Sequence, residues 1–172
     1  VQNPYNRAMK LDSYVDFFRQ TSPYIHKHRG KTFVIALDGD TVTHANFHRT
    51  IHDIALLQSL GIRIVLVHGG RLQIDQRIAQ SGEQSQFHNK LRVTNTTAMQ
   101  SVKEALGSTR WQIEAELSTG LPNSPMHGAK IKAIGGNFIT AKPIGILNGV
   151  DYQHTGEVRG IDDESIQQHL QL

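Results

Sequence analysis

Glycine-containing turns after two apolar stretches are the residues of this chain best suited to chemistry. Asp38-Gly39 follows the stretch 31–37, and His68-Gly69-Gly70-Arg71 follows the stretch 61–67. Glycines ahead of a helix let backbone N–H groups approach an anion closely, and the helix dipole favours negative charge there. A guanidinium beside the turns could hold a carboxylate through paired donors. The candidate anion-binding residues are therefore Gly39, Gly69, Gly70, Arg71 and Arg92, with structural turns and a surface ion pair as the alternatives.

Two histidines have a spacing that suits a shared metal ion. His48 and His52 are four residues apart on a predicted helix, so both imidazoles could reach one metal. No carboxylate or third histidine stands at a matching position, which favours solvent-facing histidines and predicts no metal site. The chain has no cysteine, which excludes thiolate metal sites, disulfides and a cysteine nucleophile and favours a reducing compartment.

Composition limits the partners of the chain. Its 172 residues, 38% of them hydrophobic, are enough for one domain with a modest core. The net charge is +3, but the basic residues are scattered, whereas a nucleic-acid surface needs a longer basic stripe with interleaved aromatic residues. No apolar run approaches the roughly 18 residues that span a bilayer, and no secretory signal is recognisable. We therefore expect a cytoplasmic protein without nucleic-acid or membrane partners.

The elements that position the turns form a strand–helix–strand unit. The apolar runs 32–37 and 62–67 predict parallel strands buried on both faces. Between them, a helix capped by Asn46 and stopped by Gly61 carries a core-facing stripe of Phe47, Ile51, Ile54, Leu57 and Leu60. Such crossovers build open sheets, in which ligands bind beyond the carboxyl ends of the strands. The predicted fold class is α/β, an open and mainly parallel sheet with helices on both faces, plus β-hairpins.

Further helices follow the second strand. One carries Leu72, Ile74 and Ile78 and ends near Gly82. Thr94 is expected to cap a helix that runs to Leu106 and is broken by Gly107. Thr109 and Gln112 then form a capping box for a second helix, which carries Trp111, Ile113 and Leu117.

The last third of the chain differs from the rest in composition. Glycine and proline recur from residue 121 to 160, which predicts two hairpins that turn at 135–137 and at 153–156. Asp162 can cap a final helix with Ile166 and Leu170 facing inward, and the chain ends inside that helix. Two parallel strands, hairpins and an unfinished helix make half a sheet, so we expect the sequence to be cut from a longer one.

The first 30 residues read as an arm ahead of an incomplete α/β domain at 31–172. Residues 1–7 are polar and expected to be loose, and an amphipathic helix is predicted from Asp12 until Pro23 ends it. Tyr14, Phe17 and Phe18 share one face of that helix. This face either packs on its own domain or serves as an oligomer contact with a neighbouring subunit.

Four motifs together resemble one family. They lie at 23–35, 57–75, 92–94 and 136–152, and they include P-Y-I, R-G-K-T-F-V-I, G-I-R-I-V-L-V-H-G, R-V-T and G-V-D-Y. In combination they resemble the N-terminal region of the bacterial N-acetylglutamate synthase family, and the resemblance covers nearly the whole chain. It implies an amino-acid-kinase-like domain, similar to acetylglutamate kinase and followed in the family by an acetyltransferase domain. Only part of the first domain is present here.

The resemblance also gives a meaning to the turns. Acetylglutamate kinases end the first strand in Lys-x-Gly-Gly, whose ammonium stabilises the transferring phosphoryl group, whereas this chain has Ala36-Leu37-Asp38-Gly39. Their second motif, His-Gly-Gly-Gly, has its third glycine replaced by Arg71. Because phosphoryl transfer depends on electrostatic stabilisation, these departures argue against kinase activity and assign no catalytic residue. An amino-acid pocket could survive through Gly69, Gly70 and Arg92.

The family's function implies the role of this part. The acetyltransferase domain moves an acetyl group from acetyl-CoA to L-glutamate in the first step of arginine biosynthesis. The kinase-like domain implies feedback inhibition by L-arginine and assembly of a homo-oligomer, in which the N-terminal helix joins subunits. Acetyl-CoA is then a co-substrate of the longer protein, and this part holds no cofactor. The alternatives are a working acetylglutamate kinase, or a generic α/β module that binds an anion or a metal.

Overall fold

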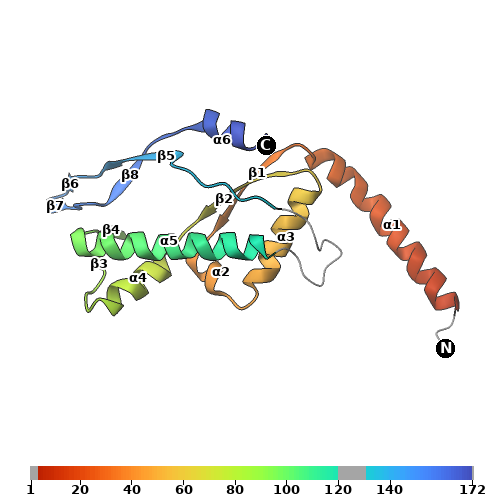
Figure 1. The fold of residues 1–172 in the computed structure, drawn as a ribbon, viewed down its shortest axis with the longest axis horizontal. Coiled ribbons are helices and arrows are strands. Elements are labelled where there is room, and N and C mark those ends of the chain that lie inside the picture. The colour runs from red at the N-terminus through yellow and green to blue at the C-terminus, as the bar shows by residue number, and fades with distance from the viewer. Residues whose placement is uncertain (1–3, 120–130, 172) are drawn as a thin grey trace.

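The computed structural model describes residues 4–119 and 131–171, with the backbone alone for residues 4–11 (Figure 1). The helices are α1 (Pro4–His28), α2 (Gly39–Thr43), α3 (Phe47–Ser59), α4 (Arg71–Gln80), α5 (Thr96–Ser118) and α6 (Asp163–His169). The strands are β1 (Thr32–Leu37), β2 (Arg63–His68), β3 (Gln86–His88), β4 (Leu91–Val93), β5 (Ile139–Pro143), β6 (Ile146–Leu147), β7 (Val150–Asp151) and β8 (Gly156–Ile161). The α/β class is confirmed.

β1 and β2 form the parallel pair that the sequence predicts. Their register runs from Thr32 opposite Arg63 to Leu37 opposite His68. The pair packs one face against α3 and the second half of α5, with Ile35, Ile64 and Leu66 against the core. The core itself consists of Leu37, Val42, Phe47, Ile51, Ile54, Ile113 and Leu117. The helix stripe predicted for 47–60 is therefore the stripe that holds the sheet.

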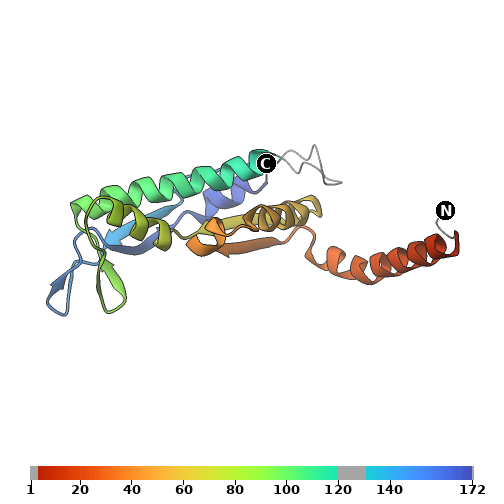
Figure 2. The same cartoon turned by 90° about the horizontal axis from the view of Figure 1, so that it is seen from below.

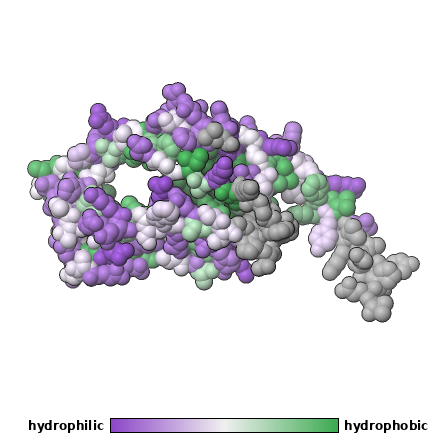
Figure 3. Space-filling model, viewed as in Figure 1, coloured by the Kyte–Doolittle hydropathy of each residue, from purple (hydrophilic) through white to green (hydrophobic). Residues whose placement is uncertain are grey.

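The opposite face of the parallel pair is open among the described residues. Val34 is 69% exposed and Val67 is 48% exposed, and their cross-strand partners Val65 and Ala36 lie on the same face. Figure 3 shows hydrophobic surface in the middle of the molecule, where β1 and β2 lie in Figure 1. The expected burial of both faces is wrong for these residues, because the helices that pack on the pair gather on its other side.

α1 is longer than expected. It begins at Pro4, where a loose segment was predicted, and continues through Pro23, which was expected to end it. A proline inside a helix removes one N–H donor and crowds the preceding turn. Just ahead of it, the hydroxyl of Thr21 donates to Phe17 O, and that of Ser22 donates to Phe18 O at 2.8 Å. The helix tolerates the proline without ending.

α1 projects away from the rest of the chain in both ribbon views (Figures 1 and 2). Tyr14, Phe17 and Phe18 are 68%, 67% and 65% exposed. Among the described residues, this face is therefore not packed on its own domain, which favours the oligomer contact of the two alternatives. At the end of α1, the His28 ring meets the Phe33 ring edge-on, with centroids 5.4 Å apart.

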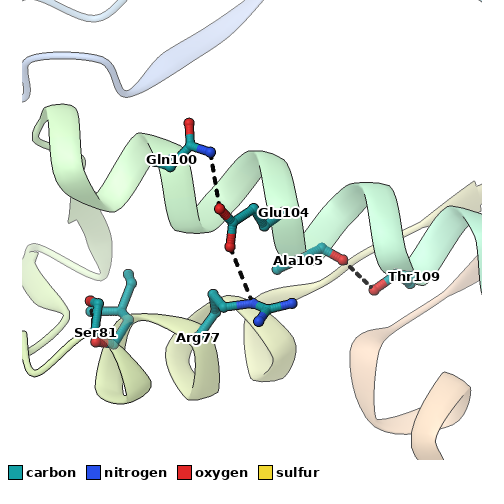
Figure 4. A network of polar contacts seen from close by, with 7 residues as sticks. Arg77, Ser81, Gln100, Glu104, Ala105 and Thr109 are labelled. Atoms are coloured by element: carbon teal, nitrogen blue, oxygen red, sulfur yellow. Dashed lines mark hydrogen bonds and ion pairs between the residues drawn. The ribbon is translucent and has the colours of Figure 1, made fainter.

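α5 is one helix of 23 residues and not two. Gly107 does not break it, and Thr109, expected as a cap, is buried in its interior and donates to Ala105 O at 2.9 Å (Figure 4). The N-cap is Asn95, whose side chain accepts from Ala98 N at 2.7 Å, in place of the predicted Thr94. One face buried along its whole length outweighs the local preference of glycine to end a helix and of threonine to begin one.

α4 lies beside the first half of α5. Figure 4 shows the guanidinium of Arg77 on α4 reaching Glu104 on α5, with Nε 3.6 Å from Oε2. Gln100 donates to the other oxygen of Glu104 at 3.0 Å. Both partners of the ion pair are almost half exposed, so they orient the helices without adding much stability.

The hairpins differ in place from those expected. β5 pairs with β8 and β6 pairs with β7, and the chain reverses at Asn148-Gly149, whose φ angles are 53° and 78°. Residues 135–137 turn no hairpin, because 131–138 are irregular; residues 121–130 lie outside the described residues. A further hairpin, β3–β4, turns at Asn89-Lys90 and was not predicted.

The last predicted helix is present as α6. The Asp162 side chain accepts from Ser165 N at 2.9 Å, which confirms this cap. Ile166 and Leu170 are half-buried and no residue of α6 is fully buried. Among the described helices, none is long and apolar enough to cross a membrane.

Candidate functional site

The two glycine turns meet at the carboxyl end of the parallel pair. Gly69 N donates to Leu37 O at 2.7 Å, which joins the end of β2 to the end of β1. A Cβ added at Gly69 would lie 3.7 Å from Asp38 Cα, so the two backbones are in van der Waals contact there. The expectation that parallel strands bring both turns to one edge is thereby confirmed.

Asp38 caps a helix that the sequence did not predict. Its Oδ1 accepts from Thr41 N at 2.8 Å and from Thr41 Oγ1 at 2.5 Å, which starts α2. These hydrogen bonds hold the pKa of Asp38 below its usual value, so the carboxylate is ionised at neutral pH. The edge of β1 therefore carries a fixed negative charge, and Ala36 supplies no cation on the strand before it.

A shallow hollow of about 340 Å³ opens beside this cap. It is lined by Asp38, Asp40, Thr41, His44, Phe47 and Thr50. His44 Nδ1 accepts from Asn46 N at 3.1 Å, so the neutral ring carries its proton on Nε2. Asp38 and Asp40 are exposed carboxylates at this hollow, and their negative charges repel phosphate groups.

The glycines of the turns are in contact with side chains of the chain itself. Gln73, on α4, donates from Nε2 to Gly39 O at 2.8 Å, and a Cβ on Gly39 would come within 2.4 Å of its Oε1. A Cβ on Gly70 would come within 2.6 Å of Leu106 Cδ2. Gln73 Oε1 and His68 Nδ1 are buried and have no hydrogen-bond partner in the described structure. Sequence reasoning missed Gln73, because only the backbone path of the two turns brings it to Gly39.

Arg71 begins α4 directly after the second turn. Gly70 is the N-cap and offers no side-chain cap, so the first N–H groups of α4 remain uncapped by a side chain. The guanidinium carbon of Arg71 lies 4.9 Å from the centroid of the Phe87 ring. That distance permits a cation–π contact, which holds the exposed Arg71 near the edge.

Arg92 lies on Phe87 as well, 4.7 Å from its centroid, but it is engaged. Its Nη1 is 2.7 Å from Asp75 Oδ1 and donates to Ser85 Oγ at 2.5 Å. Ser85 in turn donates to Asp75. Only 11% of the Arg92 side chain is exposed. A clamp on a ligand carboxylate would have to break the pair with Asp75.

The same contacts set the charge state of Asp75. Partial burial would raise the pKa of this carboxyl, but hydrogen bonds from Arg92 and Ser85, with the positive charges of Arg92 and Arg71, hold the pKa below its usual value. Asp75 is thus a permanent partner of Arg92 at neutral pH.

Backbone contacts fix Arg92 from the other side. Thr155, in the segment between β7 and β8, donates from Oγ1 to Arg92 O at 2.5 Å and lies 2.9 Å from Thr94 Oγ1. Tyr152, fully buried, donates to His88 O at 3.2 Å. The segment 152–155, between β7 and β8, therefore holds β3 and β4 in place, and with them Phe87 on β3.

The remaining candidates do not line the hollow beside Asp38. The rings of His48 and His52 on α3 meet edge-on, with centroids 6.0 Å apart and an interplanar angle of 87°. Within residues 4–119 and 131–171, no group of three or more His, Cys, Asp or Glu side chains could hold a metal ion. Tyr14, Phe17 and Phe18 lie on the projecting α1.

Comparison with known proteins assigns the chain to a family. The profile of the amino acid kinase family matches residues 31–172, which is most of the chain. The chain belongs to the amino acid kinase family. The parallel pair and the glycine turns at its carboxyl end lie inside the matched range.

Sequence relatives narrow the position within the family. The chain is 50% identical over 160 residues to the amino-acid acetyltransferase of Azotobacter vinelandii, which covers 93% of this chain and 37% of that protein. It is 50% identical over 156 residues to the amino-acid acetyltransferase of Pseudomonas aeruginosa PAO1, covering 91% of this chain and 36% of that protein. The chain thus spans little more than a third of the relatives that it matches.

Solved structures agree with the fold. N-acetylglutamate synthase from Neisseria gonorrhoeae, complexed with coenzyme A and L-arginine, superposes with a TM-score of 0.79 at 33% identity, covering 92% of this chain and 37% of that chain. The same enzyme complexed with coenzyme A and N-acetyl-glutamate gives a TM-score of 0.78 at 32% identity, covering 92% and 35%. The chain is similar to the amino-acid-kinase-like part of an N-acetylglutamate synthase.

Proposed function

We propose that this chain is the non-catalytic, amino-acid-kinase-like part of an N-acetylglutamate synthase. The longer protein would transfer the acetyl group of acetyl-CoA to L-glutamate, in the first step of arginine biosynthesis. Acetyl-CoA would be its co-substrate, and this part would need no resident cofactor. The high identity to amino-acid acetyltransferases supports the assignment, as does the match to only a third of their length. A cytoplasmic location belongs to the same proposal.

The observation that carries the non-catalytic role is the carboxylate of Asp38 at the end of β1. It is ionised, held by Thr41 and placed where the strand delivers its first turn. A phosphoryl group in transfer needs positive charge and donors around its oxygens. A fixed negative charge, with alanine at position 36, offers the reverse. The fold is then kept for control and assembly.

Regulation and assembly are the finer part of the proposal. The gonorrhoeal enzyme was crystallised with L-arginine, which supports L-arginine as the allosteric inhibitor of the longer protein. Homo-oligomerisation is supported by α1, whose exposed Tyr14, Phe17 and Phe18 recur at helical spacing on one face. An aromatic face that projects from its own domain is suited to burial in a neighbouring subunit.

An assay of the chain itself separates the proposal from the kinase alternative. Purified chain, mixed with ATP and N-acetyl-L-glutamate, should release ADP no faster than the buffer. The variant Ala36→Lys with Asp38→Gly should be equally inactive, since a cation at one strand end does not assemble a nucleotide site. Release of ADP that depends on N-acetyl-L-glutamate would establish the kinase and refute the proposal.

The longer protein tests the positive part. Protein that contains this chain, incubated with acetyl-CoA and L-glutamate, should yield N-acetylglutamate and free thiol in equal amounts, and L-arginine should inhibit the reaction. Removal of residues 1–30 should weaken inhibition by L-arginine while acetyl transfer continues. A longer protein that acetylates no L-glutamate would overturn the assignment.

A further inference from the structure

Gln73 joins the two glycine turns through a single side chain. It is the third residue of α4, just after the turn Gly69-Gly70, and its Nε2 donates back to Gly39 O in the other turn at 2.8 Å. A Cβ on Gly39 would come within 2.4 Å of its Oε1, and a Cβ on Gly70 would lie 4.0 Å from the same oxygen. The amide therefore stands between the two turns and touches the first one closely.

The oxygen of this amide is sealed in without a partner. Gln73 Oε1 is buried and accepts no hydrogen bond in the described structure. A buried acceptor that receives no donor is unfavourable, so the oxygen end of the amide does not explain its position. The bond from Nε2 to Gly39 O and the shape of the turn hold it there.

Both glycines thus accommodate parts of this chain. The space over Gly39 is filled by the Gln73 amide, and the space beside Gly70 is filled by Leu106 Cδ2 from α5. Glycine at a strand end usually allows a ligand to approach the backbone, because no Cβ stands in the way. In this chain, Gln73 and Leu106 already fill the space through which a ligand would approach.

We propose that Gln73 closes the first glycine turn from inside the chain. It is a positioning residue: its amide fixes the start of α2 against α4 and occupies the space over Gly39 that an anion would need. Glycine at position 39 is then required by Gln73 and not by a bound ligand. The closure is independent of acetyl transfer, and it adds a steric barrier to the charge of Asp38.

A double-mutant cycle tests the contact. Gly39→Ala should lower the melting temperature by about 3 °C, because the amide must move away from the methyl group and lose its hydrogen bond to Gly39 O. In the Gln73→Ala background the same substitution should lower it by less than half as much, since the space is free. Gly107→Ala is the matched control, because no atom lies within 4 Å of a Cβ there and its effect should be the same in both backgrounds. An equal cost of Gly39→Ala with and without Gln73 overturns the proposal.

Two measurements near Gly39 separate closure from a merely structural role. Titration of the unaltered chain with inorganic phosphate should shift the amide resonance of Gly39 no more than that of Gly107, and a saturable shift at Gly39 would overturn the proposal. In Gln73→Ala, α2 loses its hydrogen bond to α4, so hydrogen exchange at the Val42 amide, which donates to Asp38 O at 3.3 Å in the first turn of α2, should accelerate at least tenfold, while exchange at Ile51 in α3 stays the same. Unchanged exchange at Val42 would equally overturn it.

Discussion

Arg92 and Asp75 form a hydrogen-bonded ion pair, 2.7 Å between Nη1 and Oδ1, beside the second glycine turn. The guanidinium carbon of Arg92 also lies over the Phe87 ring, 4.7 Å from its centroid. A residue that the sequence offers as a clamp for a ligand is thus engaged by α4. The ion pair connects β4 to α4. β4 is in turn hydrogen-bonded to Thr155, in the segment between β7 and β8.

Replacement of Arg92 should destabilise the chain. Arg92→Ala removes the cation from Asp75, leaves Ser85 without its donor and removes the cation–π contact with Phe87, so we expect the free energy of unfolding to fall by about 2 kcal/mol. Arg77→Ala is the matched control: it also breaks an Arg–carboxylate pair on α4, but one that is longer and more exposed, and it should cost less than about 1 kcal/mol. Urea denaturation measures both. Equal losses in the two variants would contradict a special role for Arg92.

The pKa of Asp75 predicts a loss of stability in acid. Its pKa in the folded chain lies below the ordinary value of 3.8, so its contribution is fully present above 3.8 and disappears as the pH falls through the lower folded value. Asp75→Asn removes the titrating group. Between neutral pH and the acid limit, its free energy of unfolding should fall less than that of the unaltered chain. Parallel curves for the two proteins would show that Asp75 is not coupled to folding.

Gly107 tests the continuity of α5. Its φ angle is not in the left-handed region and no atom lies within 4 Å of a Cβ, so Gly107→Ala should raise the free energy of unfolding by about 0.5–1 kcal/mol. Gly61→Ala should do the opposite and cost about 1 kcal/mol, because φ is +87° there and Arg29 Cγ lies 3.0 Å away. Thermal melts compare the two. A destabilising Gly107→Ala would mean that the helix breaks at this residue after all.

The aromatic face of α1 is predicted to be an assembly contact. Substitution of Tyr14, Phe17 and Phe18 by alanine, or removal of residues 1–30, should lower the mass that light scattering reports, because the buried apolar area between subunits is lost. The circular dichroism of the α/β part should persist. Trp111→Ala is the control, since Trp111 is 72% exposed on α5 and has no assigned contact role. An unchanged mass in the α1 variants excludes this helix from assembly.

The local sequence pattern correctly predicted those elements that depend on a single short segment. The runs that became β1 and β2, the stripe of α3 and the cap Asp162 are fixed by apolar spacing and by one side chain each. Pro23 and Gly107 were expected to end a helix and Thr109 to begin one, but all three lie inside helices. For Gly107 and Thr109, packing along the length of α5 outweighs that preference.

The sequence by itself determined the α/β class, the parallel pair and the arrival of both glycine turns at one edge, because these depend on periodicity and on the geometry of parallel strands. It also determined the missing cation at Ala36. Only the tertiary structure decided which side chains are still free there. Arg92 is held by Asp75. Gly39 is covered by Gln73 on α4, which lies 34 residues further along the sequence. Contacts between segments that distant arise from the path of the whole backbone, and no local pattern records them.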